Sequence, residues 1–471
     1  LSITTASNAT GAISLADATT FGLTQSAVDD SYTTNAVTFG TSDVTTLDMD
    51  LGNFAGFTAN APLVVSGSGA LALNGAVTVN IADSLPAVGT VPLVSYTGGK
   101  SGAGSFVLGT LPDGVVATLD DNGTNLVSLN VTRVNDAYWT GAISTSWDTT
   151  TANWNDDYAE TSSTYADGDP VMFDDRVTDV GPEISVLLFD TVAPGGSGVT
   201  FANATKNYTL WGIGKITGTT ALTKQGVGTT TIDTINDYTG VTTVNGGILR
   251  TGILTNGGVT GPLGAADSSS SNLVLNGGTL SYTGPATTID RGFTVSGANS
   301  GIDTTNDLTV TGDVYGTAGG LVKTGAGKLT LSGLSVTMGG AGQSRVNGGI
   351  LKLDGTGGQI ASVPGDLWVS STPGVAGHLE VDSGLLSVGG WIALGRGNGD
   401  GVISNITATN SIISSANFTA GFDNALANND SDQFGSLSNS TWSNSGQMFL
   451  AESNNATSVL TLTNGSIVKL N

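Results

Sequence analysis

Apolar and polar residues alternate along much of this chain. Ala76–Ile81, Lys328–Ser332 and Ser458–Thr463 all show a period of two, which is typical of a β-strand with one buried face. Asn-Gly and Gly-Gly pairs separate such runs. Because Asn and Gly reach positive φ at low cost, these pairs predict tight turns between short strands. The turn pairs are Asn74-Gly75, Asn245-Gly246-Gly247, Asn276-Gly277-Gly278, Asn347-Gly348-Gly349 and Asn464-Gly465.

Two sequence blocks occur twice in the chain. Leu222–Gly228 and Leu321–Gly327 share the pattern L-x-K-x-G-x-G. Each is followed by the block Val-Asn-Gly-Gly-Ile-Leu, at Val244–Leu249 and again at Val346–Leu351. Repetition at this scale indicates that one small structural unit is used more than once.

A second repeat is predicted in the C-terminal part. Short apolar segments begin each unit at Trp368, Ile392, Phe418 and Phe449, which are separated by 24, 26 and 31 residues. A unit of this size with two or three short strands cannot bury its own apolar face, whereas stacked units can. A β-sandwich also has strands at short intervals but lacks this self-similarity. The repeats therefore favour a β-solenoid with roughly 24 residues per coil.

Two segments break the pattern and suggest a division of the chain. Val115–Val131 has two alternating runs around Asp121-Asn122-Gly123, which predicts an antiparallel hairpin. Tyr138–Arg176 is aromatic, acidic and poor in clean strands. We expect an N-terminal β-solenoid stack with a hairpin-like cap over residues 1–135, a Trp/Asp-rich junction over 136–180, and C-terminal solenoid repeats over 181–471.

Composition narrows the classes of function. The chain has 471 residues, 70 of them glycine, no cysteine, and a formal net charge of −24. Frequent glycine disfavours helices, and the absence of cysteine excludes disulfides and thiolate metal sites. The negative charge argues against nucleic acid as a partner, and no apolar run is long enough for a membrane helix. This composition is typical of a bacterial extracellular or cell-surface protein. Since Leu1 starts neither a complete chain nor a signal peptide, we expect a processed part of a longer protein.

The L-x-K-x-G-x-G block followed by a strand and V-N-G-G-x-L resembles the autotransporter-associated β-strand repeat, also called the passenger-associated transport repeat. Tyr238–Gly247 is similar to its second half. Trp139-Thr140-Gly141, Trp147-Asp148, Asn153-Trp154 and Tyr165–Asp169 are similar to a module that precedes such repeats in large secreted proteins of Verrucomicrobia and Planctomycetes. The resemblance covers roughly residues 136–355. It implies a right-handed parallel β-helix outside the bacterial cell, with no catalytic residues.

Catalytic chemistry finds little support in the sequence. His378 is the only histidine and lies in Gly377-His378-Leu379 with no nucleophile-elbow motif beside it. We expect an exposed turn histidine at the edge of a strand. The densest acidic cluster is Asp167, Asp169, Asp174 and Asp175 with Arg176. Turn aspartates with an ion pair are the simplest interpretation. Calcium binding and glycosidic chemistry are the alternatives.

Calcium is the one cofactor that the sequence leaves open. Asp430-Ser431-Asp432 begins like a calcium loop, but Phe434 stands at a ligand position and Thr441 at the position of the bidentate glutamate. The candidate calcium ligands are therefore Asp167, Asp169, Asp430 and Asp432. For the second pair a solvated Asn/Asp loop is the simpler interpretation, and calcium binding is the alternative.

Two further residue sets invite a structural interpretation. Trp139, Trp147 and Trp154 predict a capping core at the junction, with a sugar-stacking platform as the alternative. Lys224 and Lys323 occupy the same repeat position. We expect both at the edge of a coil, where a charge discourages unwanted strand pairing.

The function that follows is structural. We expect a non-enzymatic, stiff, acidic surface spacer whose copies stack end to end into a fibre. An adhesin that binds glycans or surfaces through loops such as 423–432 is the alternative, and a β-helix polysaccharide-degrading enzyme is the third hypothesis. The expected partner is a second copy of the chain. A surface polysaccharide is a further candidate, and neither nucleic acid nor membrane insertion is expected.

Overall fold

The fold was obtained as a computed structural model. It describes residues 2–5, 11–27, 29–51, 59–82, 89–112, 115–123, 125–134, 137–156, 162–195, 198–372, 374–395, 404–420, 432–450 and 457–470. Two compact units are present, one formed mainly by residues 1–137 and the other mainly by residues 138–154, 162–167 and 171–471. Among the described residues the sole helical element is the 3-10 turn η1 (Ser270–Asn272).

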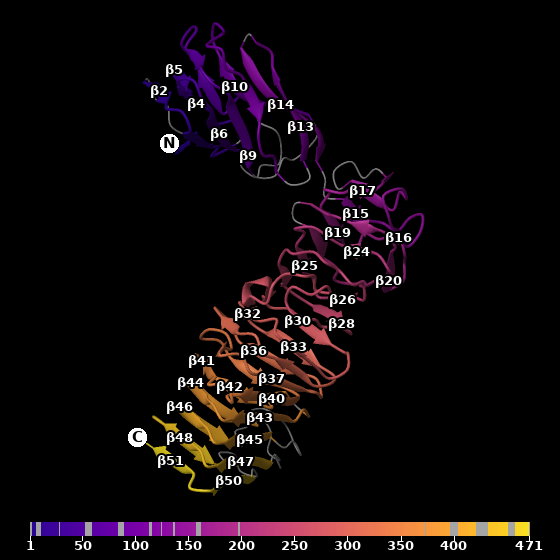
Figure 1. Cartoon of the computed structure of the whole chain (residues 1–471), viewed down its shortest axis with the longest axis vertical. Helices are drawn as coiled ribbons and strands as arrows, with labels where there is room; N and C mark the ends of the chain where they lie inside the picture. The colour runs from indigo at the N-terminus through magenta and orange to yellow at the C-terminus, as the bar shows by residue number, and fades with distance from the viewer. Residues whose placement is uncertain are drawn as a thin grey trace. The chain divides into compact units, whose positions relative to one another are not determined.

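The first unit consists of three sheets whose strands recur in turn along the chain (Figure 1). Their pairing is parallel, which is what stacked coils produce. The first sheet contains β1 (Ser2–Thr4), β3 (Thr20–Thr24), β6 (Thr45–Asp50), β9 (Val77–Ala82) and β12 (Phe106–Leu108). The second contains β4 (Tyr32–Thr34), β7 (Leu63–Val65) and β10 (Gly89–Tyr96), and the third β2 (Ala12–Leu15), β5 (Ala36–Phe39), β8 (Leu71–Leu73) and β11 (Lys100–Ser101).

An antiparallel hairpin closes the second sheet of this unit. Strands β13 (Val115–Asp121) and β14 (Leu126–Val134) pair antiparallel, and β14 pairs antiparallel with β10. The hairpin predicted from the alternating runs is therefore confirmed. At the turn, the Asn122 side chain accepts hydrogen bonds from the backbone N–H groups of Asn125 and Leu126, which fixes the reversal.

The second unit is built from three parallel ladders. The first ladder runs through β16 (Ser146–Trp147), β20 (Glu183–Leu188), β23 (Asn207–Trp211), β26 (Thr229–Ile232), β28 (Ile248–Thr251), β30 (Thr279–Tyr282), β33 (Ser300–Thr304), β36 (Leu321–Thr324), β39 (Ser344–Val346) and β42 (Leu367–Val369). The second runs through β15 (Ala137–Trp139), β19 (Val171–Phe173), β22 (Val199–Phe201), β25 (Leu222–Lys224), β27 (Thr242–Val244), β29 (Leu273–Leu275), β32 (Phe293–Val295), β35 (Val314–Gly316), β38 (Ser335–Thr337) and β41 (Ile360–Val363).

Two long strands join these ladders toward the C-terminus. β44 (Leu385–Leu394) pairs with both β41 and β42, and β46 (Ile412–Ala420) continues both ladders. They are followed by β48 (Thr441–Asn444) and β51 (Ile467–Leu470) on one side and by β49 (Met448–Leu450) on the other. Four further short strands lie between residues 154 and 216: β17 (Trp154–Asp156), β18 (Ser162–Ser163), β21 (Thr191–Val192) and β24 (Lys215–Ile216).

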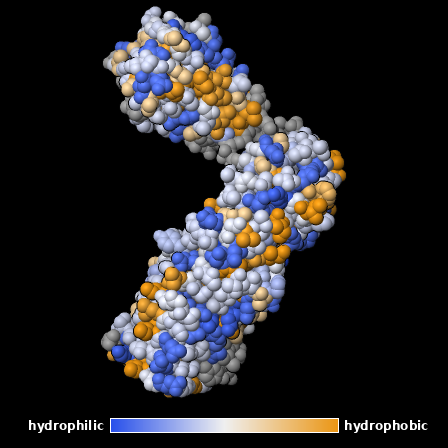
Figure 2. All heavy atoms as spheres, viewed as in Figure 1, coloured by the Kyte–Doolittle hydropathy of each residue, from blue (hydrophilic) through white to orange (hydrophobic). Residues whose placement is uncertain are grey.

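The third ladder contains β31 (Thr287–Ile289), β34 (Leu308–Val310), β37 (Lys328–Leu331), β40 (Gly349–Asp354), β43 (Gly377–Asp382), β45 (Ser404–Thr409), β47 (Asp432–Ser438) and β50 (Thr457–Thr463). The chain is thus all-β with long parallel sheets, as in a β-solenoid. In Figure 1 the strands of this unit follow one another like rungs, and Figure 2 shows that polar and apolar residues are mixed on its outer surface.

Like residues stack in the core. Leu308, Leu329, Leu351, Leu379 and Ile406 are successive partners in the third ladder, and each is at most 2% exposed. The steps between them are 21, 22, 28 and 27 residues, as their residue numbers give. Turn length therefore varies from coil to coil while the register of the strands is kept.

The apolar segments expected to begin at Trp368, Ile392, Phe418 and Phe449 pair with one another only in part. Ile392 pairs with Phe418, and both are buried. Trp368 instead pairs with Ala393, and Phe449 pairs with Thr419. Trp368 and Phe449 therefore stand one position off, and because successive strand residues point to opposite faces they point outward.

Shortening one member of the leucine stack is expected to destabilise the second unit. Leu351→Ala leaves a cavity between Leu329 and Leu379, so we expect a loss of about 2–5 kcal/mol in the free energy of unfolding, measured by guanidinium denaturation. Thr309→Ala, on the outer face of the same ladder, is the matched control and should change it by about 0.5 kcal/mol or less. Equal effects of the two substitutions would contradict the stacked core.

Candidate functional site

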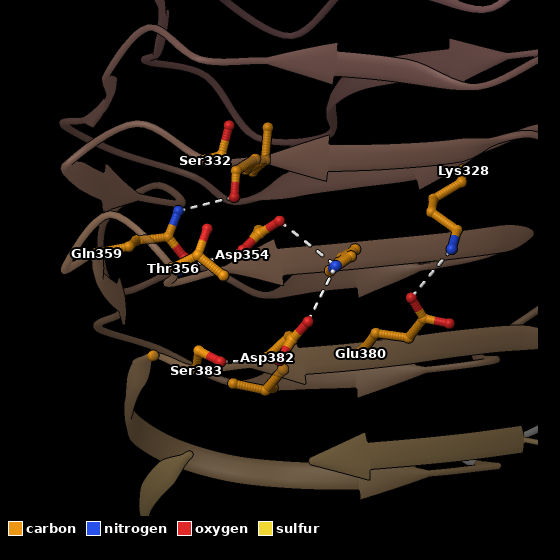
Figure 3. Close-up of polar contacts among 12 residues, drawn as sticks. Lys328, Ser332, Asp354, Thr356, Gln359, Glu380, Asp382 and Ser383 are labelled. Atoms are coloured by element: carbon orange, nitrogen blue, oxygen red, sulfur yellow. Dashed lines mark hydrogen bonds and ion pairs between the residues drawn. The ribbon is translucent and has the colours of Figure 1, made fainter. Parts of the chain in front are cut away.

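A charged network covers part of the outer face of the third ladder. Because Leu329, Leu351 and Leu379 point inward, the residues next to them in sequence point outward. Strands β37, β40 and β43 thereby place two lysines, three carboxylates and the single histidine on one surface. Figure 3 shows Lys328 reaching toward Glu380, and Asp354 lying near Asp382. The members are Lys328, Lys352, Asp354, His378, Glu380 and Asp382.

The ion pairs of this network tie three coils together. Lys328 Nζ lies 3.2 Å from Glu380 Oε2, so its side chain crosses the intervening strand β40. Lys352 Nζ lies 3.1 Å from Asp382 Oδ2 and 3.4 Å from Asp354 Oδ2. Although burial opposes the shift, hydrogen bonding and attraction to Asp382 and Asp354 raise the pKa of Lys352 above its ordinary value. Each ion pair contributes roughly 1 kcal/mol or less to the free energy of unfolding. Because the pairs with Glu380 and Asp382 join different coils, they favour the correct register between those coils.

His378 is not the exposed turn residue expected from the sequence. It lies in strand β43, half-buried, with Nε2 3.1 Å from Thr407 Oγ1 and Nδ1 4.0 Å from Glu380 Oε1. Burial lowers the pKa of His378, with Lys328 adding to the shift and Glu380 opposing it. Burial therefore favours the neutral imidazole. A separation of 4.0 Å is too long for the hydrogen bond that would orient a catalytic histidine.

Asp167, Asp174 and Asp175 of the acidic cluster each have separate polar partners. Asp167 Oδ1 accepts hydrogen bonds from the Tyr165 hydroxyl and the Ala193 backbone N–H. Asp169 is buried at 5% exposure. Asp174 pairs with Arg176 at 2.6 Å, which is the local ion pair expected for turn aspartates.

Asp175 connects one coil to the next. Its carboxylate accepts hydrogen bonds from the backbone N–H groups of Ala204, Thr205 and Lys206 at 3.0–3.1 Å. Burial opposes the shift, but these donors hold the pKa of Asp175 below its ordinary value. The carboxylate thus satisfies three backbone donors of a neighbouring turn.

Calcium binding stays a prediction. Within the described ranges no group of three or more His, Asp or Glu side chains is placed to hold a metal ion. Asp430 lies outside the described residues, and Asp432 begins strand β47.

The three junction tryptophans form a buried aromatic core, which confirms the capping interpretation. Trp139, Trp147 and Trp154 are at most 1% exposed. Trp139 and Trp147 both pack against Trp154 with ring centroids 5.1 and 5.5 Å apart, and Phe173 contacts all three rings. Their burial leaves no ring face for a sugar, so the alternative is wrong.

Lys224 and Lys323 are not at the coil edge, contrary to the expectation. Both are fully buried at inward positions, where their ladder partners are Phe201 and Val244 for Lys224 and Ile302 and Val346 for Lys323.

Each of these lysines donates to the carbonyls of its own turn. Lys224 Nζ lies 2.7 Å from Gln225 O and 2.9 Å from Gly226 O. Lys323 Nζ donates to Thr324 O and, at 3.1 Å, to Gly325 O. Gly226 and Gly325 have φ of +75° and +76°, a conformation that suits glycine. The repeated Lys and Gly positions therefore form one structural motif, here called the lysine clamp.

A hollow with polar and apolar lining residues lies over the outer face of the first sheet in the first unit. It has a volume of about 610 Å³, and its lining includes Thr20, Asp48, Asp50, Asn80 and Thr110. The Asn80 amide donates to Asp48 Oδ1 at 2.8 Å, and Asn80 Oδ1 accepts from the Thr110 backbone N–H at the same distance. These groups are suited to hydrogen bonding with a small polar ligand.

Sequence reasoning missed the charged network and this hollow. The signal for the network was present, because Lys352 and Asp354 in Gly-Ile-Leu-Lys-Leu-Asp and Glu380 and Asp382 in Gly-His-Leu-Glu-Val-Asp occupy the polar positions of two alternating runs. Aligning these two strands would have placed the charges side by side. A similar signal was present for the hollow, because Thr46–Met49 and Thr78–Ile81 share the pattern Thr-apolar-Asp/Asn-apolar and pair in register, with Asp48 opposite Asn80.

Comparison with known proteins confirms the resemblance seen in the repeats. Residues 222–250 and 321–353 match the Passenger-associated-transport-repeat family. The chain is also 35% identical over 248 residues to the protein named "Adhesin BmaC autotransporter" from Brucella suis biovar 1 (strain 1330). This alignment covers 49% of the chain and 7% of that relative, so the chain spans a small part of its length. No solved structure matches the chain.

Both matched repeat segments begin with a lysine clamp. The chain therefore carries two passenger-associated transport repeats, and its location is extracellular or at the cell surface. The described residues contain no helix with the length and apolar character that a membrane crossing requires.

The lysine clamps predict an unusual dependence of stability on pH. Burial lowers the pKa of both Lys224 and Lys323 to about 8, although Asp175 opposes the shift for the first and Asp303 and Asp307 oppose it for the second. Between pH 8 and 10 the folded state releases protons that the unfolded lysines, with an ordinary pKa of 10.5, retain. Stability should therefore rise with pH, by up to about 1.4 kcal/mol per pH unit for each lysine.

Denaturant unfolding between pH 7.5 and 9.5 measures this slope. Lys323→Met removes one titrating amine and should reduce the slope. Lys352→Met is the matched control, because the pKa of that surface lysine is raised and its loss should not reduce the slope. A wild-type stability that falls over this range would show that the clamps do not titrate as described.

Proposed function

We propose that this chain is a non-catalytic shaft of a cell-surface adhesive protein, with the right-handed coiling that the repeat family implies. The observation that carries the proposal is the pair of passenger-associated repeats within a chain that aligns over 248 residues with an autotransporter adhesin. The shaft holds binding surfaces away from the cell and repeats them along its length.

Four features of the geometry support a mechanical role. Interior strands are hydrogen-bonded to a neighbour on each side, so no free strand edge is offered along the ladders. The lysine clamps fix turns from inside, and the charged network with Lys328 and Glu380 ties coils from outside. Carboxylates such as Asp175 fasten the turn of the next coil. The strand pairing, the charged network and the Asp175 contacts run from coil to coil, which resists bending and local opening.

A bead assay tests the adhesive part of the proposal. Beads coated with the purified chain should be retained on cultured epithelial monolayers several-fold more than beads coated with the heat-unfolded chain, because a repeated folded surface makes many weak contacts at once. Albumin-coated beads control for non-specific adsorption. Equal retention of folded and unfolded chain would refute an adhesive surface. Release of reducing ends from surface polysaccharide during the assay would refute the non-catalytic part.

We also propose that copies of the chain associate with one another. Strands β49, β50 and β51 carry exposed apolar side chains, among them Leu450, Leu462 and Leu470 at 48%, 46% and 64% exposure. Strand pairing with a second copy would cover them.

The net charge of −24 opposes such association, so screening should promote it. Light scattering at high protein concentration should show larger particles in millimolar calcium chloride than in buffer of low ionic strength. Sodium chloride at equal ionic strength separates screening from calcium binding. Monomers under all three conditions, or larger particles at low ionic strength, would refute self-association by this route.

A further inference from the structure

One outward row of the second ladder consists almost entirely of hydroxyl side chains. From β22 to β48, successive strands place one residue of this row in each coil, and ten of the eleven are Thr, Ser or Tyr. The exception is Val274. The row, here called the hydroxyl row, is Thr200, Thr223, Thr243, Val274, Thr294, Tyr315, Thr337, Ser362, Ser387, Ser414 and Ser443.

Most of these hydroxyls have no hydrogen-bond partner among the residues that the structure describes. Within the described ranges, Thr294 donates to Ser270 O at 2.8 Å, whereas no side-chain hydrogen bond is found for eight of the others. Those eight are Thr200, Thr223, Thr243, Thr337, Ser362, Ser387, Ser414 and Ser443. Parallel neighbours in a sheet are about 4.8 Å apart. The row therefore presents donors and acceptors at regular intervals along the ladder.

The strands that carry the row also avoid charge. Apart from the buried Lys224, the eleven strands of this ladder from β22 to β48 contain no Asp, Glu, Lys or Arg. The chain as a whole has 38 acidic and 14 basic residues. The third ladder differs, because its outward face holds the Lys328–Glu380 network. The strands of this face are therefore uncharged on their outer side, although the protein as a whole is acidic.

Apolar side chains and one aromatic ring complete the face. Ile360, Leu385 and Ile412 form a second outward row beside the hydroxyls, at 58%, 37% and 54% exposure. Figure 2 shows apolar residues following one another on the side where Figure 1 places β41, β44 and β46. Tyr315, within the hydroxyl row, is 59% exposed. An exposed ring beside hydroxyl groups combines an apolar contact with a polar one.

We propose that this face binds an extended, uncharged polysaccharide lying along the ladder. A hydroxyl group both donates and accepts hydrogen bonds, so it matches sugar hydroxyls without requiring one fixed orientation. Tyr315 and the aliphatic row supply apolar contact for the C–H faces of the rings. Each contact is weak, but many act together along one polymer, which gives useful affinity through multivalency. The inference rests on the adhesive function proposed above and names its ligand.

The neutrality of the face selects among ligands. An acidic polysaccharide would gain nothing from a face without basic side chains and would be repelled by the net charge of −24. A basic polymer would bind better to the acidic surfaces elsewhere. A neutral polymer has no such preference and should bind with little dependence on salt.

Affinity electrophoresis of the folded chain tests the proposal. Gels containing one of four neutral polymers, namely hydroxyethylcellulose, barley β-glucan, glucomannan or dextran, are compared with a gel containing alginate. At least one neutral polymer should retard the chain, and alginate should not. Ser362→Asp combined with Ser414→Asp places two carboxylates on the hydroxyl row and should weaken that binding at least tenfold.

The control adds the same charges to another face. Thr309→Asp combined with Ser436→Asp lies on the outer face of the third ladder and should bind as the wild type does. Tyr315→Ala should weaken binding several-fold, while Tyr315→Phe, which keeps the ring, should weaken it less. Circular dichroism establishes that each variant is folded.

Three results would overturn the inference: no retardation of the wild type by any neutral polymer, equal loss in the two double variants, or stronger retardation by alginate. If the coated beads still adhere to cells while no neutral polymer retards the chain, the ligand class is wrong and the adhesive function stands. If the polymers retard the chain but the beads do not adhere, the adhesive function is wrong and the ligand class stands.

Discussion

The in-register parallel pairing of each strand with the strand one coil away is the interaction on which the rest of the molecule depends. It brings residues of the same kind together across coils, as Leu329, Leu351 and Leu379 show in the core. The same pairing aligns Lys352 with Glu380 outside, and it places the lysine of each clamp between apolar residues of its own ladder. Residues at equivalent positions of successive coils therefore share the same surroundings, and each row tends to contain side chains of one chemical type.

Much of the fold could be predicted because local signals agree with it. The alternating runs mark real strands, and Asp121-Asn122-Gly123 lies at the turn of a real hairpin. Register was harder to predict. Trp368 and Phe449 look like core residues, but a shift of one residue turns both side chains outward. Lys224 looked like a surface residue because a buried amine needs carbonyl partners, and the turn that supplies them is visible only in three dimensions.

The hydroxyl row could not be predicted from the sequence, for a related reason. The hydroxyl row joins residues such as Thr243, Thr294 and Ser387, which share no constant spacing in the sequence because turn lengths differ from coil to coil. Composition records many Ser and Thr residues but not that they line up. The aspartates show the opposite case, since Asp167 and Asp175 are close in sequence but serve different turns.

The tolerance of the coils for turns of different length also bears on how such a chain can change over generations. Steps of 21 to 28 residues in the third ladder keep the same inward row. Duplication of one coil in the gene would add one member to every row at once, in the core and on each face, without disturbing the coils on either side. Selection can therefore lengthen or shorten the molecule in whole steps, and each step extends a neutral face and a charged face together.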